Sequence, residues 1–326
     1  MVGCGPAGAT AARVAAARGL SVMMIDRRRS VGMPPRCAGY VPQWVRLRTH
    51  CDDSAIMQAV SGIRIVEAHG KIRDISAPGY ILDRTRFDKN LAIHAIEAGA
   101  DLAQAMVLRR EGFHLFGRRN GHEAVFSADY ILGADGPSSV IGRSVGLGNR
   151  QFWATLQYEV GLKTPDVWFE LYPLAEHAGV LWFVPCGQTA RIGIGMPRGH
   201  ARFLKLRLHA FFQQLVSDGR VYNGILGCSG GLMPVNGPLQ TLHADRILLA
   251  GDAGGIAEPF SGAGIASAII CGELAGDVMG AASQNHCPDL LNDYDVTLAS
   301  LLPMTETPHM FERVSQMAAW SPRVLT

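Results

Sequence analysis

The hydrophobic and polar positions in the first part of the chain predict alternating strands and helices. An Ala-rich stretch at 9–18 predicts a helix, and the mostly apolar run at 20–25 predicts a buried strand that ends at Asp26. Apolar residues at helical spacing predict a second helix at 84–98, and residues 130–134 predict a short strand. Alternation of this kind is typical of an α/β fold with a parallel sheet.

The pattern changes in the middle of the chain and then returns. Short apolar runs that predict successive strands occur at residues 152–160, 167–172, 180–184 and 191–194. We interpret them as an antiparallel sheet followed by a helix at 203–216, whereas a strand at 246–250 and a helix from 264 resume the first pattern. The sequence therefore predicts a discontinuous Rossmann-like domain at residues 1–75, 84–150 and 235–282. An α+β substrate domain at 151–234 interrupts it, and a C-terminal helical segment follows at 283–326.

Composition narrows the class of protein. Of 326 residues, 48% are hydrophobic and 18% are charged, as in an ordinary globular chain, and the net charge of +2 argues against a nucleic-acid partner. The seven Cys form no C-x-x-C pair and the His residues no metal-binding spacing, so we expect neither a disulfide framework nor a metal. These features favour a reducing, cytoplasmic location.

The chain shows no clear membrane or targeting signal. Because it begins directly with a glycine motif, we expect no signal peptide. The longest stretch of small apolar residues, 265–282, is broken by Glu273 and Asp277 and is too polar to predict a membrane span. Peripheral contact with the inner face of a membrane stays open.

A glycine-rich turn opens the first helix. Gly3-Cys4-Gly5-Pro6-Ala7-Gly8 fits the G-x-G-x-x-G pattern, in which glycines allow a tight turn, close approach of the backbone to a diphosphate, and close helix packing. The free N–H groups of the helix start would bind the diphosphate. Asp26 is placed to accept hydrogen bonds from the adenosine ribose, and Arg27 follows it. Only Met1 and Val2 remain for the strand expected before the motif.

Two later segments favour FAD over a nicotinamide cofactor. Residues 133–143 form a strand and a tight turn at Asp135-Gly136, which alone would be an ordinary Asp-Gly turn. Residues 248–265 form a strand, a turn at Gly251-Asp252 and a helix start. We expect Asp252 to accept a hydrogen bond from a ribityl hydroxyl. The backbone at the helix start would face the flavin ring, and the residues we assign to this last segment of the cofactor site are Gly251, Asp252, Pro259, Gly262, Gly264 and Ile265.

Together, the three motifs resemble the p-hydroxybenzoate hydroxylase-type flavoproteins. That superfamily includes aromatic monooxygenases, flavin halogenases, electron-transfer-flavoprotein:quinone oxidoreductases and geranylgeranyl reductases. The resemblance implies a non-covalent FAD. The positions that match the family motifs are Gly3, Gly5, Gly8, Asp26, Asp135, Gly136, Gly251, Asp252, Gly262 and Gly264.

Smaller features favour one branch of that superfamily. Residues 32–41 are similar to the cysteine loop of geranylgeranyl and archaeal digeranylgeranyl-glycerophospholipid reductases, and residues 84–91 to their arginine helix. Residues 182–185 resemble the end of their Y-x-W-x-F-P cavity signature, although Val180 and Val184 replace the Tyr and the Phe. The resemblance implies reduction of C=C bonds in a hydrophobic prenyl lipid by hydride from reduced flavin. The external electron donor, NAD(P)H or ferredoxin, stays open.

Several residues have both a functional and a structural interpretation. Cys37 and Trp182 are our candidate catalytic residues, but a free Cys is usually a small buried hydrophobe and a Trp in a sheet is often a core residue. Arg84 would contact FAD or cap its helix. We also assign Arg36, Cys37 and Ala38 to the cofactor site. The expected walls of the substrate tunnel are Phe152, Trp168, Trp182 and Phe183.

Three other functions compete with the prenyl reductase. A flavin monooxygenase or halogenase, acting on an aromatic or polyketide-like substrate, is disfavoured by the cysteine loop and by the partial match to W-x-W-x-I-P, which is limited to Trp182 and Pro185. A quinone-linked electron-transfer flavoprotein is disfavoured because the chain lacks four-Cys cluster spacing. A flavin-binding protein without turnover is the third alternative.

Overall fold

The computed structural model describes residues 1–67, 70–174, 179–257 and 264–302. One part of it is built around a parallel sheet, as the sequence predicts. Val2 forms parallel bridges to both Gly133 and Ile25, so the two residues before the glycine motif serve as a minimal central strand. The strands of this part are β1 (Met23–Asp26), β5 (Asp101–Gln104), β9 (Ile131–Gly133), β15 (His243–Ala244) and β16 (Ile247–Leu249).

Helix α1 (Pro6–Ala17) packs against both α3 (Arg84–Glu97) and α6 (Ile265–Gln284). Glycines on α6 allow a close approach to α1, because an added Cβ would lie 2.4 Å from Ala7 O at Gly272 and 2.6 Å from Ala11 O at Gly276. Within the described residues, α6 alone is long and apolar enough to cross a membrane, but 78% of its apolar window is buried inside the protein. Its apolar character is therefore explained by packing in the core.

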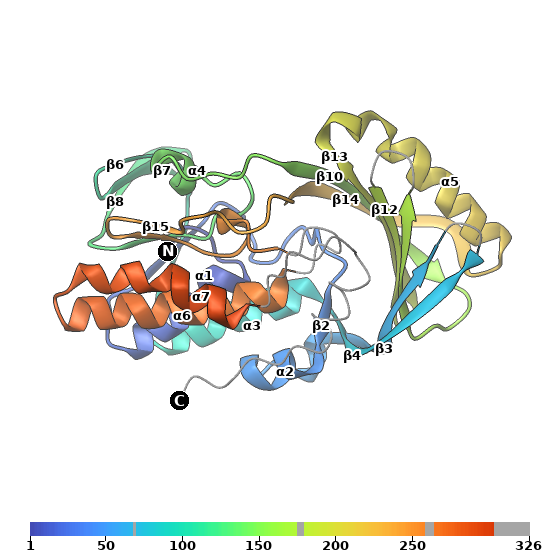
Figure 1. Cartoon of the computed structure of the whole chain (residues 1–326), viewed down its shortest axis with the longest axis horizontal. Coiled ribbons are helices and arrows are strands. Elements are labelled where there is room, and N and C mark those ends of the chain that lie inside the picture. Colours follow the sequence, from blue (N-terminus) through green and yellow to red (C-terminus); the bar gives the residue numbers. More distant parts are fainter. Residues whose placement is uncertain (68–69, 175–178, 258–263, 303–326) are drawn as a thin grey trace.

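The second part is an eight-stranded sheet in the order β14-β10-β13-β12-β11-β3-β4-β2. Figure 1 shows this sheet and α5 (Leu204–Ser217) at one end of the molecule, and α1, α3, α6 and α7 (Asp293–Leu301) at the other. Side chains alternate between the faces, and one face packs on Leu208 and Phe212 of α5. The strands are β2 (Tyr40–Pro42), β3 (Ile56–Val66), β4 (Ile72–Leu82), β10 (Phe152–Leu162), β11 (Trp168–Leu174), β12 (Gly179–Cys186), β13 (Thr189–Pro197) and β14 (Val221–Pro234).

This sheet differs from the expected domain division. The sequence analysis assigned residues 1–75 to the nucleotide domain, but β2, β3 and β4 belong to the second sheet. Strand β3 pairs in parallel with β11, Ile63 opposite Phe169, so the sheet is mixed instead of purely antiparallel. The difference arises because an alternating sequence indicates a strand without identifying its partner. Whether the three predicted domains fold as separate units stays a prediction.

The remaining elements lie around these two sheets. A three-stranded meander consists of β6, β7 and β8, and a short 3₁₀ turn precedes α7. The C-terminal segment is helical up to residue 301, and residues 303–326 lie outside the described residues. The bounds are α2 (Gln43–Thr49), β6 (Met106–Glu111), β7 (His114–Arg119), β8 (His122–Ser127), α4 (Val140–Ser144) and α7 (Asp293–Leu301).

Candidate flavin and substrate site

A cavity of about 600 Å³ lies between the parallel sheet and the face of the eight-stranded sheet opposite α5. It brings together predicted site residues from segments that are far apart in the sequence. Gly8 is outside its lining, and Pro259 and Gly262 lie outside the described residues. The predicted residues that line the cavity are Gly3, Gly5, Pro6, Ala7, Asp26, Arg27, Arg36, Cys37, Ala38, Arg84, Asp135, Gly136, Trp182, Gly251, Asp252, Gly264 and Ile265.

The glycine motif forms one end of this cavity. Gly3 has φ +101°, and an added Cβ would lie 2.2 Å from Ala134 O, so only glycine fits there. At Gly5, by contrast, an added Cβ would meet nothing within 4 Å, which leaves open space directly before helix α1. Asp26 accepts backbone hydrogen bonds from Cys4 and Arg28, both at 2.8 Å. An anion-binding helix start with a fixed carboxylate beside it fits the diphosphate and ribose of a dinucleotide.

The carboxylate of Asp135 is used inside its own turn. It accepts hydrogen bonds from Ser139 Oγ at 2.5 Å and from the Val140 N–H at 2.6 Å, at the start of α4. The predicted residue is therefore at the cavity, but its side chain shapes the loop. Gly136, with φ +85°, lines the cavity beside it.

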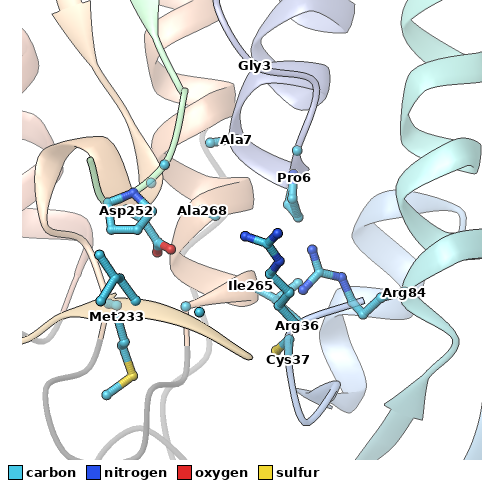
Figure 2. Close-up of a pocket in the computed structure, with 18 of the residues that line it drawn as sticks. Gly3, Pro6, Ala7, Arg36, Cys37, Arg84, Met233, Asp252, Ile265 and Ala268 are labelled. Carbon is cyan, nitrogen blue, oxygen red and sulfur yellow. The ribbon is translucent and has the colours of Figure 1, made fainter. Parts of the chain in front are cut away.

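Asp252 lies on the opposite side of the cavity from Arg36 and Arg84 (Figure 2). Burial raises the pKa of its carboxyl, and the nearby Arg84 opposes that rise. Asn149, which the sequence analysis missed, donates hydrogen bonds to Pro137 O at 3.0 Å and to Asp252 O at 2.7 Å. This amide joins the two later flavin motifs, and a single Asn in a loop carries no sequence signal for such a role.

Arg36 and Cys37 of the cysteine loop, together with Arg84 of α3, line one side of the cavity. Figure 2 shows both Arg36 and Arg84 extended toward Pro6 at the start of α1. Arg84 makes a bidentate ion pair with Asp88, at 2.9 Å for each bond, and Asp88 is only 2% exposed. Burial by itself lowers the pKa of Arg84, but the charge of Asp88 and contact with Cys37 outweigh it and raise the pKa. Arg84 thus borders the same cavity as Cys37, and the N-cap of its helix is Asp83.

The rest of the lining is an apolar wall on the eight-stranded sheet. The Trp182 ring lies over Gly193, where an added Cβ would be 2.1 Å from the indole, and its Nε1 donates to Gln157 at 3.2 Å. Trp153 lies over Gly195 in the same way, at 3.1 Å. Of the expected wall residues, Trp182 lines the cavity, whereas Phe152, Trp168 and Phe183 do not. The other side chains of this wall are Trp153, Phe169, Leu171, Val180 and Leu232. Phe183 packs on the α5 face because neighbouring strand residues point to opposite faces.

Comparison with known proteins identifies the class. A family model described as FAD binding domain matches residues 1–202. The digeranylgeranylglycerophospholipid reductase of Methanococcus vannielii is 28% identical over 313 residues, which cover 90% of this chain and 80% of the relative. Digeranylgeranylglycerophospholipid reductase 1 of Methanopyrus kandleri is 33% identical over 301 residues, which cover 85% of this chain and 79% of the relative.

Solved structures agree with this grouping. A geranylgeranyl bacteriochlorophyll reductase-like protein from Thermoplasma acidophilum has a TM-score of 0.86 at 28% identity, over 98% of this chain and 87% of the other. The flavin-dependent brominase Bmp2 shares the fold alone, with a TM-score of 0.74 at 15% identity, over 91% of this chain and 82% of the other. The chain therefore belongs to the FAD-binding domain family, in the branch that contains these digeranylgeranylglycerophospholipid reductases, and is an FAD-dependent oxidoreductase. The predicted fold class and cofactor are confirmed.

Proposed function

We propose that the protein reduces C=C bonds of a prenyl lipid of geranylgeranyl type. The observation that supports this most is that one cavity joins the flavin motifs to an apolar wall of indole and aliphatic side chains. An isoprenoid chain offers no polar group for recognition, so it requires a wall of this kind. The relatives named as digeranylgeranylglycerophospholipid reductases support the same substrate class.

The residues of the cavity divide into two groups in this proposal. Gly3 and Gly5 of the turn before α1, together with Asp26 and Asp252, bind the cofactor. The glycine turn lies at the diphosphate and Asp252 at the ribityl chain. Arg36 and Arg84 add positive charge beside the start of α1. Trp153 and Trp182 orient the lipid and exclude water from the reacting bond.

The reaction needs a hydride and a proton. FAD, when bound and reduced, supplies the hydride to one alkene carbon. An unactivated alkene stabilises negative charge poorly, so the other carbon needs a proton early. We propose that Cys37 Sγ, which lines the cavity beside Arg84, holds that proton. NAD(P)H or ferredoxin as electron donor, and contact with the inner membrane face, remain predictions.

The test is an anaerobic half-reaction. The FAD-loaded protein is photoreduced and mixed with a geranylgeranyl lipid; flavin reoxidation is followed by absorbance and hydrogens gained by the lipid are counted by mass spectrometry. We expect reoxidation with increments of two hydrogens per bond. Cys37→Ser should slow it, and the matched Cys228→Ser, at an exposed Cys outside the cavity, should leave it unchanged. Reoxidation by air alone, with an oxygenated product, would instead support a monooxygenase.

A further inference from the structure

Arg191 on β13 is a buried cation that crosses from the eight-stranded sheet to the cysteine loop. Its side chain is 6% exposed and lies on the same face of β13 as Gly193 and Gly195. One guanidinium nitrogen donates to Ala38 O at 3.0 Å and to Leu82 O at 3.1 Å, and the other contacts Met57 Sδ at 3.1 Å. The first two contacts bridge residues that are 153 and 109 positions apart in the sequence.

The contacts of Arg191 differ from those of two partly buried arginines. Arg84 and Arg220 are paired with carboxylates, Arg84 with Asp88 and Arg220 with Glu170 and Asp166. Among the described residues, Arg191 has no carboxylate within ion-pair distance, and carbonyl oxygens are its polar partners. Removing a charged group from water is costly unless its hydrogen bonds are replaced. The Arg191 guanidinium is therefore stable in its buried position only while it donates to these carbonyl oxygens.

The loop has a conformation that accommodates this contact. Gly39 has φ +92°, and an added Cβ would lie 2.6 Å from the Arg191 guanidinium. The Leu82 N–H donates to Gly39 O at 2.9 Å, so Gly39 and Leu82 are joined both directly and through Arg191. Leu82 is followed by the start of α3, which carries Arg84, and Ala38 is preceded by Cys37. Arg191 therefore holds together the two segments whose side chains, Cys37 and Arg84, both line the cavity.

We propose that Arg191 is a positioning residue that fixes Cys37 at the cavity by holding the Cys37–Gly39 backbone to the start of α3. The importance of Cys37 in the reaction rests on the proposed function, but its placement by Arg191 does not. When the guanidinium is removed, Ala38 O and Leu82 O lose a charged donor, and the loop opens more often from the sheet. Because hydrogen bonds to a charged group are worth more than neutral ones, opening should increase on the order of tenfold.

The test measures alkylation of each Cys in the FAD-loaded protein, with iodoacetamide as probe and peptide mass spectrometry as readout. Cys37 is partly buried, whereas Cys228 is exposed on β14 and serves as the internal reference. We compare wild type, Arg191→Met, Arg191→Lys and Arg220→Met. The last is the matched control, because Arg220, directly before β14, is a partly buried arginine whose contacts do not reach the loop.

We expect the Cys37-to-Cys228 rate ratio to rise on the order of tenfold in Arg191→Met, to rise less in Arg191→Lys, and to stay at the wild-type value in Arg220→Met. A wild-type ratio in folded Arg191→Met overturns the proposal, as does an equal rise in Arg220→Met. If Arg191→Met does not fold, Arg191→Lys decides, because a shorter ammonium cannot reach both carbonyls as the guanidinium does. No lipid is present, so failure of prenyl reduction leaves this result intact.

Discussion

The close packing of α6 on α1 makes a quantitative prediction about two glycines of one helix. A Cβ at Gly276 would lie 2.6 Å from the backbone oxygen of Ala11, so Gly276→Ala must move one helix relative to the other. A Cβ at Gly280 would instead meet the flexible Arg18 side chain, 2.2 Å from Cδ, which can move away if it gives up its ion pair with Asp277. Both substitutions gain the same helix propensity, up to about 1 kcal/mol, so this gain cancels when the two variants are compared.

The remaining difference is the cost of overpacking against backbone, about 1–3 kcal/mol. Gly280→Ala disturbs only the exposed Arg18–Asp277 pair, 2.8 Å apart, which as a surface ion pair contributes little. We therefore expect Gly276→Ala to melt roughly 2–5 °C below Gly280→Ala.

The assay is thermal unfolding of both variants without FAD, followed by titration with FAD. Helix α1 starts at the diphosphate end of the cavity, so Gly276→Ala should also bind FAD more weakly. Equal melting temperatures and equal FAD affinity in the two variants would refute the argument that backbone contact at Gly276 sets the distance between α1 and α6.

Three further predictions concern the cavity. Burial raises the pKa of Asp252, so this carboxyl stays protonated to higher pH in the folded apoprotein than in the unfolded chain. Stability should therefore fall as the pH rises above 3.8, the ordinary pKa of an Asp. The urea midpoint, plotted against pH, should lose this slope in Asp252→Asn. Gly193→Ala, whose Cβ would lie 2.1 Å from Trp182, should impair lipid turnover while FAD content is kept, and Gly224→Ala, with nothing within 4 Å, should match wild type in both. Asn149→Ala removes two hydrogen bonds and should weaken FAD binding by about 1–3 kcal/mol, measured by fluorescence titration.

Sequence patterns grouped the glycine turn, its helix and Asp26, which line one cavity, because the rules for such a motif are local. The glycine turn, the helix after it and Asp26 follow one another within 26 residues, and each has a fixed geometric role. The reduced first strand was also visible, and Val2 does pair on both sides. By contrast, the pairing of β3 with β11 was not predicted, because β11 lies about a hundred residues later and strand pairing at that distance leaves no local pattern.

The substrate side was predicted less accurately for a related reason. The aromatic wall was placed one residue off at Phe152 and Trp168, since Trp153 and Phe169 are the side chains that face the cavity. A shift of one residue exchanges the two faces of a strand, and neighbouring aromatics give no basis for choosing between them. Arg191 and Asn149 were missed because their partners are backbone oxygens, which any sequence supplies.

The parallel pairing of β3 with β11 has a consequence for how the chain is made. When residues 56–82 leave the ribosome, the edge of β3 has no partner until β11 is synthesised, and an unpaired edge strand invites association with other chains. Non-local pairing of this kind also slows folding. A fragment that ends near residue 150 would contain both strands of the β3–β4 hairpin and still leave the edge of β3 exposed. We therefore expect this fragment to be insoluble when it is produced alone, even though its glycine motif is intact.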